Sequence, residues 1–145
     1  MKRRDFIVLG SAGTATSIIA PNDVLAGIAA CPDSSKMAGG LYYTKDAPGR
    51  WSGKVKGHLP NIDIATSNGA TSIKIVTSHE MAGYTHYITK HIVLDGRFKF
   101  LTEKQFDPMQ DKLPASEHQL GNYSGRIHVL SVCNTHDTWL NLVDI

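Results

Sequence analysis

The chain has 145 residues, of which 41% are hydrophobic and 19% are charged, and its formal net charge is +2. This length and composition predict one globular domain with a real hydrophobic core, and they exclude a disordered chain and a small disulfide-rich scaffold. The near-neutral charge comes without a visible cluster of Lys and Arg in the body of the chain, which argues against nucleic acid as a partner.

The first 26 residues have the pattern of an export signal. A basic start is followed by a modestly apolar run, residues 7–20, that is too short to span a membrane. The order Arg3-Arg4-Asp5-Phe6-Ile7 matches the twin-arginine signal, and Val24-Leu25-Ala26 has the small-residue spacing of a signal-peptidase site. We therefore expect residues 1–26 to be a twin-arginine signal peptide and the mature protein to be periplasmic.

Cys31 allows two further readings. Ile28-Ala29-Ala30-Cys31 resembles a lipoprotein box, in which Cys31 would be lipidated and would tether the protein to a membrane. Pro21-Asn22-Asp23 interrupts the apolar run before that box, so we favour the form without a lipid. In an exported protein, a disulfide between Cys31 and Cys133 is also conceivable, although we rate it below metal ligation by Cys133.

Residues 27–40 are small and polar and predict a flexible linker, which leaves residues 41–145 as the folded domain. Trp51 follows a Pro-Gly turn and is expected to pack at the edge of this domain. Gly57 and Pro60 bracket His58, so that residues 54–65 predict a broken extended segment with His58 on a loop.

The rest of the chain predicts short strands separated by Gly and Pro. Alternating or β-branched runs indicate strands at 72–77, 86–94 with a hairpin partner at 97–101, around His118 within a long connection, at 126–133 and at 139–143. The segment Arg126 to Cys133 is the most regular, with Ile127, Val129, Ser131 and Cys133 on one face. About seven strands without a long helical stripe predict an antiparallel β-sandwich.

Cys133 and His136 end this strand only three residues apart. Such a pair suits a soft metal site, a Cys–His nucleophile, or no chemistry at all. Of the seven histidines, four stand at breaks or ends of predicted strands; these are His58, His79, His86 and His136. The other three, His91, His118 and His128, are expected to be surface or structural residues.

Four imidazoles converging with one thiol favour a transition-metal site. A blue-copper site is less well supported, because no Met follows His136. A hydrolase dyad is disfavoured, because Cys133 and His136 lie on one turn and no oxyanion site is suggested.

These residues also resemble a known family. Cys133-Asn134-Thr135-His136, with Trp139 following, is similar to the C-N-x-H-G-x-W signature of superoxide reductases, the neelaredoxin and desulfoferrodoxin family. Three further stretches resemble the family's E-H-Y-I, H-P-M and E-K-H-V-P motifs, and these are Thr85-His86-Tyr87-Ile88, His79-Glu80-Met81 and Lys56-Gly57-His58-Leu59-Pro60. The resemblance runs in order from Trp51 to Trp139.

The resemblance implies an immunoglobulin-like β-sandwich of the one-iron type. Its mononuclear non-haem iron, cycling between Fe2+ and Fe3+, would have four equatorial imidazoles and one axial thiolate, from His58, His79, His86, His136 and Cys133. Family members reduce superoxide to hydrogen peroxide and need an external electron donor, expected here to be a small redox protein; a homo-oligomer is also allowed. The alternative is a non-catalytic module on the same fold that binds or senses iron or zinc.

The chain departs from the family pattern at several positions. Gly57 stands where the family has the lysine that guides superoxide, and Lys56, which replaces a family glutamate, or Lys54 is expected to take over that role. Asp137 replaces a glycine, which predicts a hydrogen bond to an imidazole or repulsion of superoxide. One extra residue separates His79 from His86, and a β-bulge is expected to absorb it.

Overall fold

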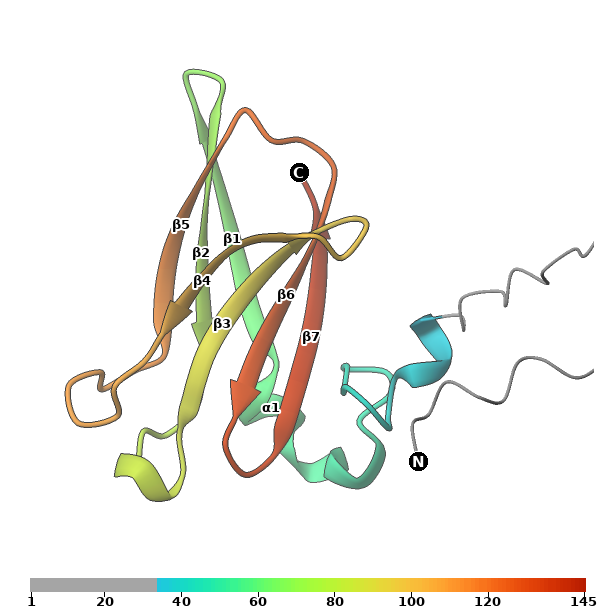
Figure 1. The fold of residues 1–145 in the computed structure, drawn as a ribbon, viewed down its shortest axis with the longest axis vertical. Coiled ribbons are helices and arrows are strands. Elements are labelled where there is room, and N and C mark those ends of the chain that lie inside the picture. Colours follow the sequence, from blue (N-terminus) through green and yellow to red (C-terminus); the bar gives the residue numbers. More distant parts are fainter. Residues whose placement is uncertain (1–33) are drawn as a thin grey trace, which may run out of the picture. The chain divides into compact units, whose positions relative to one another are not determined.

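A computed structural model describes residues 34–145, so the predicted signal peptide, Cys31 and the first part of the predicted linker lie outside the described residues. The described chain forms seven β-strands in two antiparallel sheets that face each other, which confirms the predicted immunoglobulin-like β-sandwich (Figure 1). One sheet has the order β1-β2-β5 and the other β4-β3-β6-β7. The strands are β1 (Pro60–Ser67), β2 (Ala70–Thr77), β3 (Ile88–Asp95), β4 (Phe100–Gln105), β5 (Ala115–Gly121), β6 (Arg126–Cys133) and β7 (Asp137–Asp144).

The core lies between the two sheets and follows from the alternation of side chains along each strand. Every second residue of β6 from Ile127 to Cys133 is buried, as the period of two predicts. Two of them, Ile127 and Val129, meet side chains of β2 and β3 in one apolar cluster, made of Ile73, Ile75, Val93, Ile127 and Val129. Burying each of these side chains contributes about 1.5–3 kcal/mol to folding.

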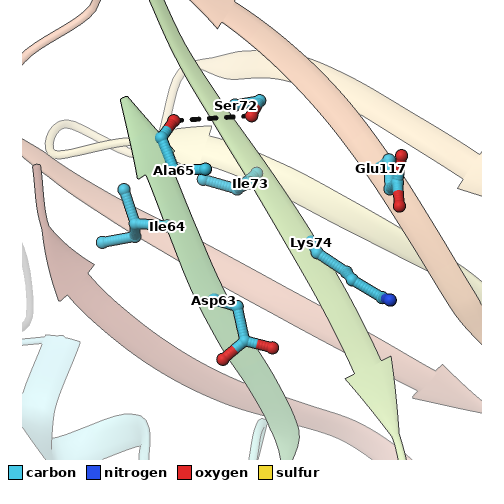
Figure 2. Close-up of a pocket in the computed structure, with 7 residues that line it drawn as sticks. All are labelled: Asp63, Ile64, Ala65, Ser72, Ile73, Lys74 and Glu117. Atoms are coloured by element: carbon cyan, nitrogen blue, oxygen red, sulfur yellow. Dashed lines mark hydrogen bonds between the residues drawn. The ribbon is translucent and has the colours of Figure 1, made fainter. Parts of the chain in front are cut away.

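The outer face of the three-stranded sheet is polar. Asp63 lies opposite Lys74, and Lys74 lies opposite Glu117, so three charges of alternating sign cross the sheet in one row. Figure 2 shows this face, where the Ser72 hydroxyl also donates a hydrogen bond to the Ala65 carbonyl at 3.4 Å. None of the predicted site residues lies here.

Three predicted boundaries were wrong. His58 ends a one-turn helix, α1 (Val55–His58), rather than lying on a loop, and β1 begins two residues later. His86 precedes β3 instead of opening it. The return strand begins at Phe100 rather than at residue 97, because the Asp95 carboxylate accepts hydrogen bonds from the backbone N–H groups of residues 97 and 99 and lengthens the turn.

One end of the sandwich collects the segments that carry the predicted site. Helix α1, the end of β2, the start of β3 and the β6–β7 turn all lie at this end (Figure 1). Two 3-10 turns border it, η2 (Gly49–Lys54) before α1 and η3 (Gly83–Thr85) before β3, and a third, η1 (Ser34–Met37), lies in the predicted linker. In residues 34–145, no helix is long and apolar enough to cross a membrane.

Candidate metal centre

All five residues predicted to bind metal come together in the structure. One donor atom from each of His58, His79, His86, Cys133 and His136 lies within 4.8 Å of the other four. They come from α1, the β2–β3 connection and the β6–β7 turn, so the fold gathers residues up to 78 positions apart. Four of the five side chains are buried and His86 is half-buried.

The four imidazoles form a square. Going round in the order His58, His136, His86, His79, neighbouring ring centres are 4.7, 4.7, 4.5 and 4.6 Å apart, and neighbouring rings are close to perpendicular. His58 and His86 are 6.1 Å apart, as opposite corners of a square must be further apart than neighbours. The facing nitrogens of three sides are separated by 3.0, 2.9 and 3.1 Å.

The Cys133 thiol lies off the side of this square. Its sulfur is 3.8 Å from His79 Nε2 and 3.7 Å from His136 Nδ1, which belong to opposite corners. The sulfur is about as far from one of these corners as from the other and lies within 4.8 Å of the remaining two donors, so it stands off one face of the square. A metal ion held by the four nitrogens would therefore have the sulfur as a fifth donor within reach.

The donor atoms are set to bind a cation rather than one another. His136 Nδ1 faces both His58 Nε2 and His86 Nε2, yet a ring nitrogen has only one proton or one lone pair to offer in its plane. His58 Nδ1 donates to the Lys54 carbonyl at 2.9 Å, which leaves the lone pair of the neutral ring on Nε2, inside the square. Imidazole binds zinc at about 2.0–2.1 Å, and a square built on that bond length has sides of about 3.0 Å, so the residues present fit a metal ion.

Burial favours neutral imidazoles, the form that binds metal. Loss of water contact lowers the pKa of His58 to about 4, against the opposing effect of its hydrogen bond to Lys54. Burial and then the charge of His86 also lower the pKa of His79. For His136, burial, His86 and the ammonium of Lys54 lower the pKa in that order.

Hydrogen bonds hold the thiol and His136 in place. The N–H of Thr135 lies 3.4 Å from the Cys133 sulfur, and a donor at that position stabilises a thiolate. The indole N–H of Trp139 donates to the His136 carbonyl at 3.0 Å, and the Trp139 ring is fully buried. The turn that carries Cys133 and His136 is therefore anchored in the core.

Asp137 does not bond an imidazole. Its carboxylate accepts hydrogen bonds from the Arg50 guanidinium and, at 2.9 Å, from the Trp51 indole. The Arg50 bond first, and then the Trp51 bond, hold the pKa of Asp137 below its usual range, so it is ionised and paired. The Trp51 ring also packs edge-on against His136, with ring centres 4.7 Å apart, and this contact goes beyond the edge packing expected from the sequence.

The two lysines proposed from the sequence differ in their relation to the square. Lys54 is exposed at the end of η2, and its charge acts on His136. Lys56 is exposed on α1 between Lys54 and His58. Gly57 has ordinary space beside it, since a Cβ there would lie 3.7 Å from the nearest atom, the Ser78 carbonyl oxygen.

Asn134 is a site residue that the sequence did not single out. Its side chain accepts a hydrogen bond from the Tyr87 N–H at 2.9 Å and lies 3.2 Å from the carbonyls of Tyr84 and Thr85, to which its amide donates. These bonds fasten the turn after Cys133 to the segment that carries His86. The segment between His79 and His86 contains the 3-10 turn η3, and the register shift in the pairing of β3 with β6 lies after His86, between Ile88 and Lys90, so the expected bulge is not between the two histidines.

The remaining three histidines lie outside the square, as predicted, although none is a surface residue. His91 is fully buried between Thr77 and Ser116, with hydrogen bonds of 2.9 and 2.8 Å. His118 bonds Ser116 at 3.0 Å, and His128 bonds the Asp95 carbonyl at 2.9 Å. They are satisfied structural histidines.

No protein-family model and no curated protein matches this sequence. Solved structures do. A variant of the superoxide reductase (neelaredoxin) from Ignicoccus hospitalis has 22% identity and a TM-score of 0.62, with 72% of this chain and 93% of that chain covered. The superoxide reductase from Nanoarchaeum equitans has 16% identity and a TM-score of 0.55, with 62% of this chain and 94% of that chain covered.

A hypothetical protein from Pyrococcus horikoshii is also similar, with 17% identity, a TM-score of 0.54 and 62% and 89% of the two chains covered. Identities at this level establish a shared fold. The chain therefore has the β-sandwich fold of the superoxide reductases and carries, at one end of it, four histidines and a cysteine arranged to hold one metal ion.

Proposed function

We propose that this chain is a superoxide reductase of the one-iron type, which reduces superoxide to hydrogen peroxide at a mononuclear iron held by His58, His79, His86, His136 and Cys133. The observation that carries the proposal is the square of four imidazoles with a sulfur off one face, close to all four. Imidazole suits iron, and a thiolate on one side of the square leaves the other side for a small ligand. The fold shared with superoxide reductases supports the same conclusion.

The reaction takes up one electron and two protons for each superoxide. Iron bound in the square would supply that electron, and the axial thiolate would push electron density towards the open side. The chain itself holds the ligands rigid: the Lys54 carbonyl fixes the His58 ring, and Trp51 and Trp139 fix His136. Rigid neutral donors let the metal change oxidation state without rebuilding its surroundings.

Superoxide is an anion, and the segment before the first histidine is cationic. Residues 49–58 contain Arg50, Lys54 and Lys56 and no acidic residue. Arg50 is paired with Asp137, so Lys54 and Lys56 are the residues we propose to attract superoxide in place of the lysine missing at Gly57. The influence of Lys54 on His136 favours Lys54 for the part nearer the metal.

We further propose that residues 1–26 direct export by the twin-arginine route and that the protein works in the periplasm, free or anchored through Cys31. The support is the sequence pattern alone. Export of a folded protein suits a site whose five ligands come from three separate segments, because the metal would be enclosed as the sandwich forms.

The test is the visible spectrum and superoxide reactivity of anaerobically purified protein. The iron-loaded chain is expected to show a thiolate-to-iron charge-transfer band that Cys133→Ser abolishes and that His128→Gln, at a buried histidine outside the square, leaves unchanged. An unchanged spectrum in Cys133→Ser would contradict the ligand assignment. Stopped-flow mixing with superoxide should yield one hydrogen peroxide per ferrous site, whereas a metal-binding module without turnover would yield none.

A further inference from the structure

Beside the metal centre lies an exposed surface that the proposed chemistry does not use. We call it the Tyr84 surface, and it consists of Tyr84, Asp107, Met109 and Asp111. Tyr84 is 64% exposed and Met109 is 62% exposed. The Tyr84 hydroxyl and the backbone N–H of Met109 donate to the same oxygen of Asp107, at 3.1 and 2.9 Å, so Asp107 joins these two residues although they are 25 positions apart.

The Tyr84 surface has a fixed shape. The Asp107 carboxylate also accepts a hydrogen bond from the Gln110 amide at 2.8 Å, and the Asp107 N–H donates to Asp111 at 2.8 Å. Tyr84 stands edge-on to Tyr87, with ring centres 5.9 Å apart. Exposed aromatic and methionine side chains on a preorganised loop are typical of surfaces that bind another protein.

The charge on this side of the centre is negative. Residues 78–89 and 106–114 contain three carboxylates, on Glu80, Asp107 and Asp111, and one ammonium, on Lys112, which gives 1 − 3 = −2. On the α1 side, residues 49–58 carry Arg50, Lys54 and Lys56, and Arg50 is paired with Asp137, so the net charge of these four residues is 3 − 1 = +2. The two borders of the metal centre therefore have opposite charge, and an anion such as superoxide is not drawn to the Tyr84 side.

The Tyr84 surface is joined to the axial cysteine by a short path. Asn134 follows Cys133 in the chain and donates from its side chain to the Tyr84 carbonyl at 3.2 Å. The Tyr87 N–H donates to the Asn134 side chain at 2.9 Å, and the Asn134 N–H donates to the Tyr87 carbonyl at 3.1 Å. The covalent bonds from Cys133 to Asn134, the next residue, and these hydrogen bonds connect the sulfur to the backbone of Tyr84 and Tyr87.

We propose that the Tyr84 surface is the docking site of the electron donor, and that this donor is a small cationic one-electron carrier. The inference rests on the proposed function, because superoxide reduction requires one electron per turnover. The reduced carrier would lose one electron and become oxidised, with the Tyr84 surface and the Asn134–Cys133 link lying between it and the metal that the square would hold. Superoxide then takes up that electron and two protons to give hydrogen peroxide, after approaching from the α1 side.

Binding is tested first with zinc-loaded protein, in which no electron can move, using a lysine-rich ferrocytochrome c as the probe. NMR titration at low ionic strength should shift signals of residues 84–87 and 107–111. Tyr84→Ser and Met109→Ser should each weaken binding about five-fold or more, as loss of an exposed anchor does. Ile64→Ser, at an apolar residue 40% exposed on β1, is the matched control and should leave binding unchanged.

The contribution of negative charge to donor binding is tested with two variants that each remove one carboxylate charge. Asp111→Asn keeps an oxygen to accept the Asp107 N–H and should weaken binding about three-fold at low salt, with the difference lost at high salt. Asp63→Asn makes the same change in net charge on the outer face of β1 and should have no effect. Equal weakening by both variants, or shifts confined to residues 49–58, would overturn the proposed site, and no binding of this cationic probe at low salt would overturn a cationic donor.

Electron transfer is then measured with iron-loaded protein, and the two half-reactions are followed separately. Tyr84→Ser should slow the reduction of ferric protein by ferrocytochrome c about five-fold and leave the oxidation of ferrous protein by superoxide unchanged. Equal slowing of both half-reactions would show that Tyr84 only maintains the structure of the metal site and does not bind the donor. If the wild-type chain binds the probe but does not react with superoxide, the proposed function fails while the docking site stands.

Discussion

The buried His91 should make the stability of the sandwich depend on pH. Its ring lies between the sheets, and the hydrogen bonds around it have one consistent direction, because the Thr77 hydroxyl donates to Ser131. Thr77 must then accept from His91 Nε2–H, and His91 Nδ1 must accept from the Ser116 hydroxyl. A proton on Nδ1 would face that hydroxyl, and burial followed by the charge of His118 lowers the pKa of His91 to about 3.

The size and sign of the effect follow from proton linkage. Above pH 6.5, the ordinary pKa of the unfolded residue, both states are neutral at His91 and its full contribution to stability is present. Between about pH 6.5 and 3, only the unfolded chain binds the proton, so the free energy of unfolding falls by about 1.4 kcal/mol per pH unit. At pH 4.5 the loss from this one group is about 2.7 kcal/mol.

Urea unfolding at pH 7.5 and 4.5 of the wild type and of His91→Gln, each with the same metal content, measures this loss. The variant should be less stable at pH 7.5, by about 1–3 kcal/mol for disturbed buried hydrogen bonds, but it should lose about 2.7 kcal/mol less on acidification. The contributions of the other histidines cancel in this comparison. His91→Phe also lacks the titrating group and should give the same difference between the two pH values, and equal acid losses in all three chains would refute the reasoning.

Three further outcomes are expected. Gly57→Lys has space for its Cβ and replaces a helical glycine, so it should raise the free energy of unfolding by up to about 1 kcal/mol. It should also speed the oxidation of the ferrous protein by superoxide several-fold at low ionic strength, as measured by pulse radiolysis. An unchanged rate would show that position 57 does not guide the anion. Asn134→Ala should cost about 2–3 kcal/mol in urea unfolding, because three side-chain hydrogen bonds are lost, and a cost near zero would contradict the role of this residue in joining two segments of the site. A free metal concentration of 1,000 times the Kd should add about 4 kcal/mol to the free energy of unfolding, and chelation should remove the same amount. Equal melting curves with and without metal would argue against the site.

The strands of the core could be predicted from the sequence because their pattern is local. In β6 Ile127, Val129, Ser131 and Cys133 are all buried, and this period of two specifies both the strand and its inward face, although His128 on the other face is buried too. The five donors of the metal centre could be chosen because they are chemically distinctive and stand near strand ends. The short helix that holds His58 could not be predicted, since four residues give no helical period and Gly57 disfavours a helix.

Contacts between distant segments were also out of reach of the sequence. Trp51 and Asp137 are 86 positions apart, and nothing local to either residue indicates their hydrogen bond. The same holds for the bond between Tyr84 and Asp107, which creates the Tyr84 surface. Residues of this kind gain a role only when the fold has placed their segments side by side.

Asp137 shows how one such contact changes the meaning of a departure from the family pattern. Its φ of +61° lies in the left-handed region, where glycine is favoured and where any other residue is disfavoured by about 1–2 kcal/mol. The hydrogen bonds from Arg50 and Trp51 offset that cost, and they join the segment that carries His58 to the turn that carries His136. A glycine at position 137 would remove the strain but also this link, and Arg50 would then be free to attract anions. Pairing with Asp137 therefore neutralises the positive charge of Arg50 beside the four histidines and adds rigidity there. Lys54 and Lys56 are then the residues of this segment that we propose to attract superoxide.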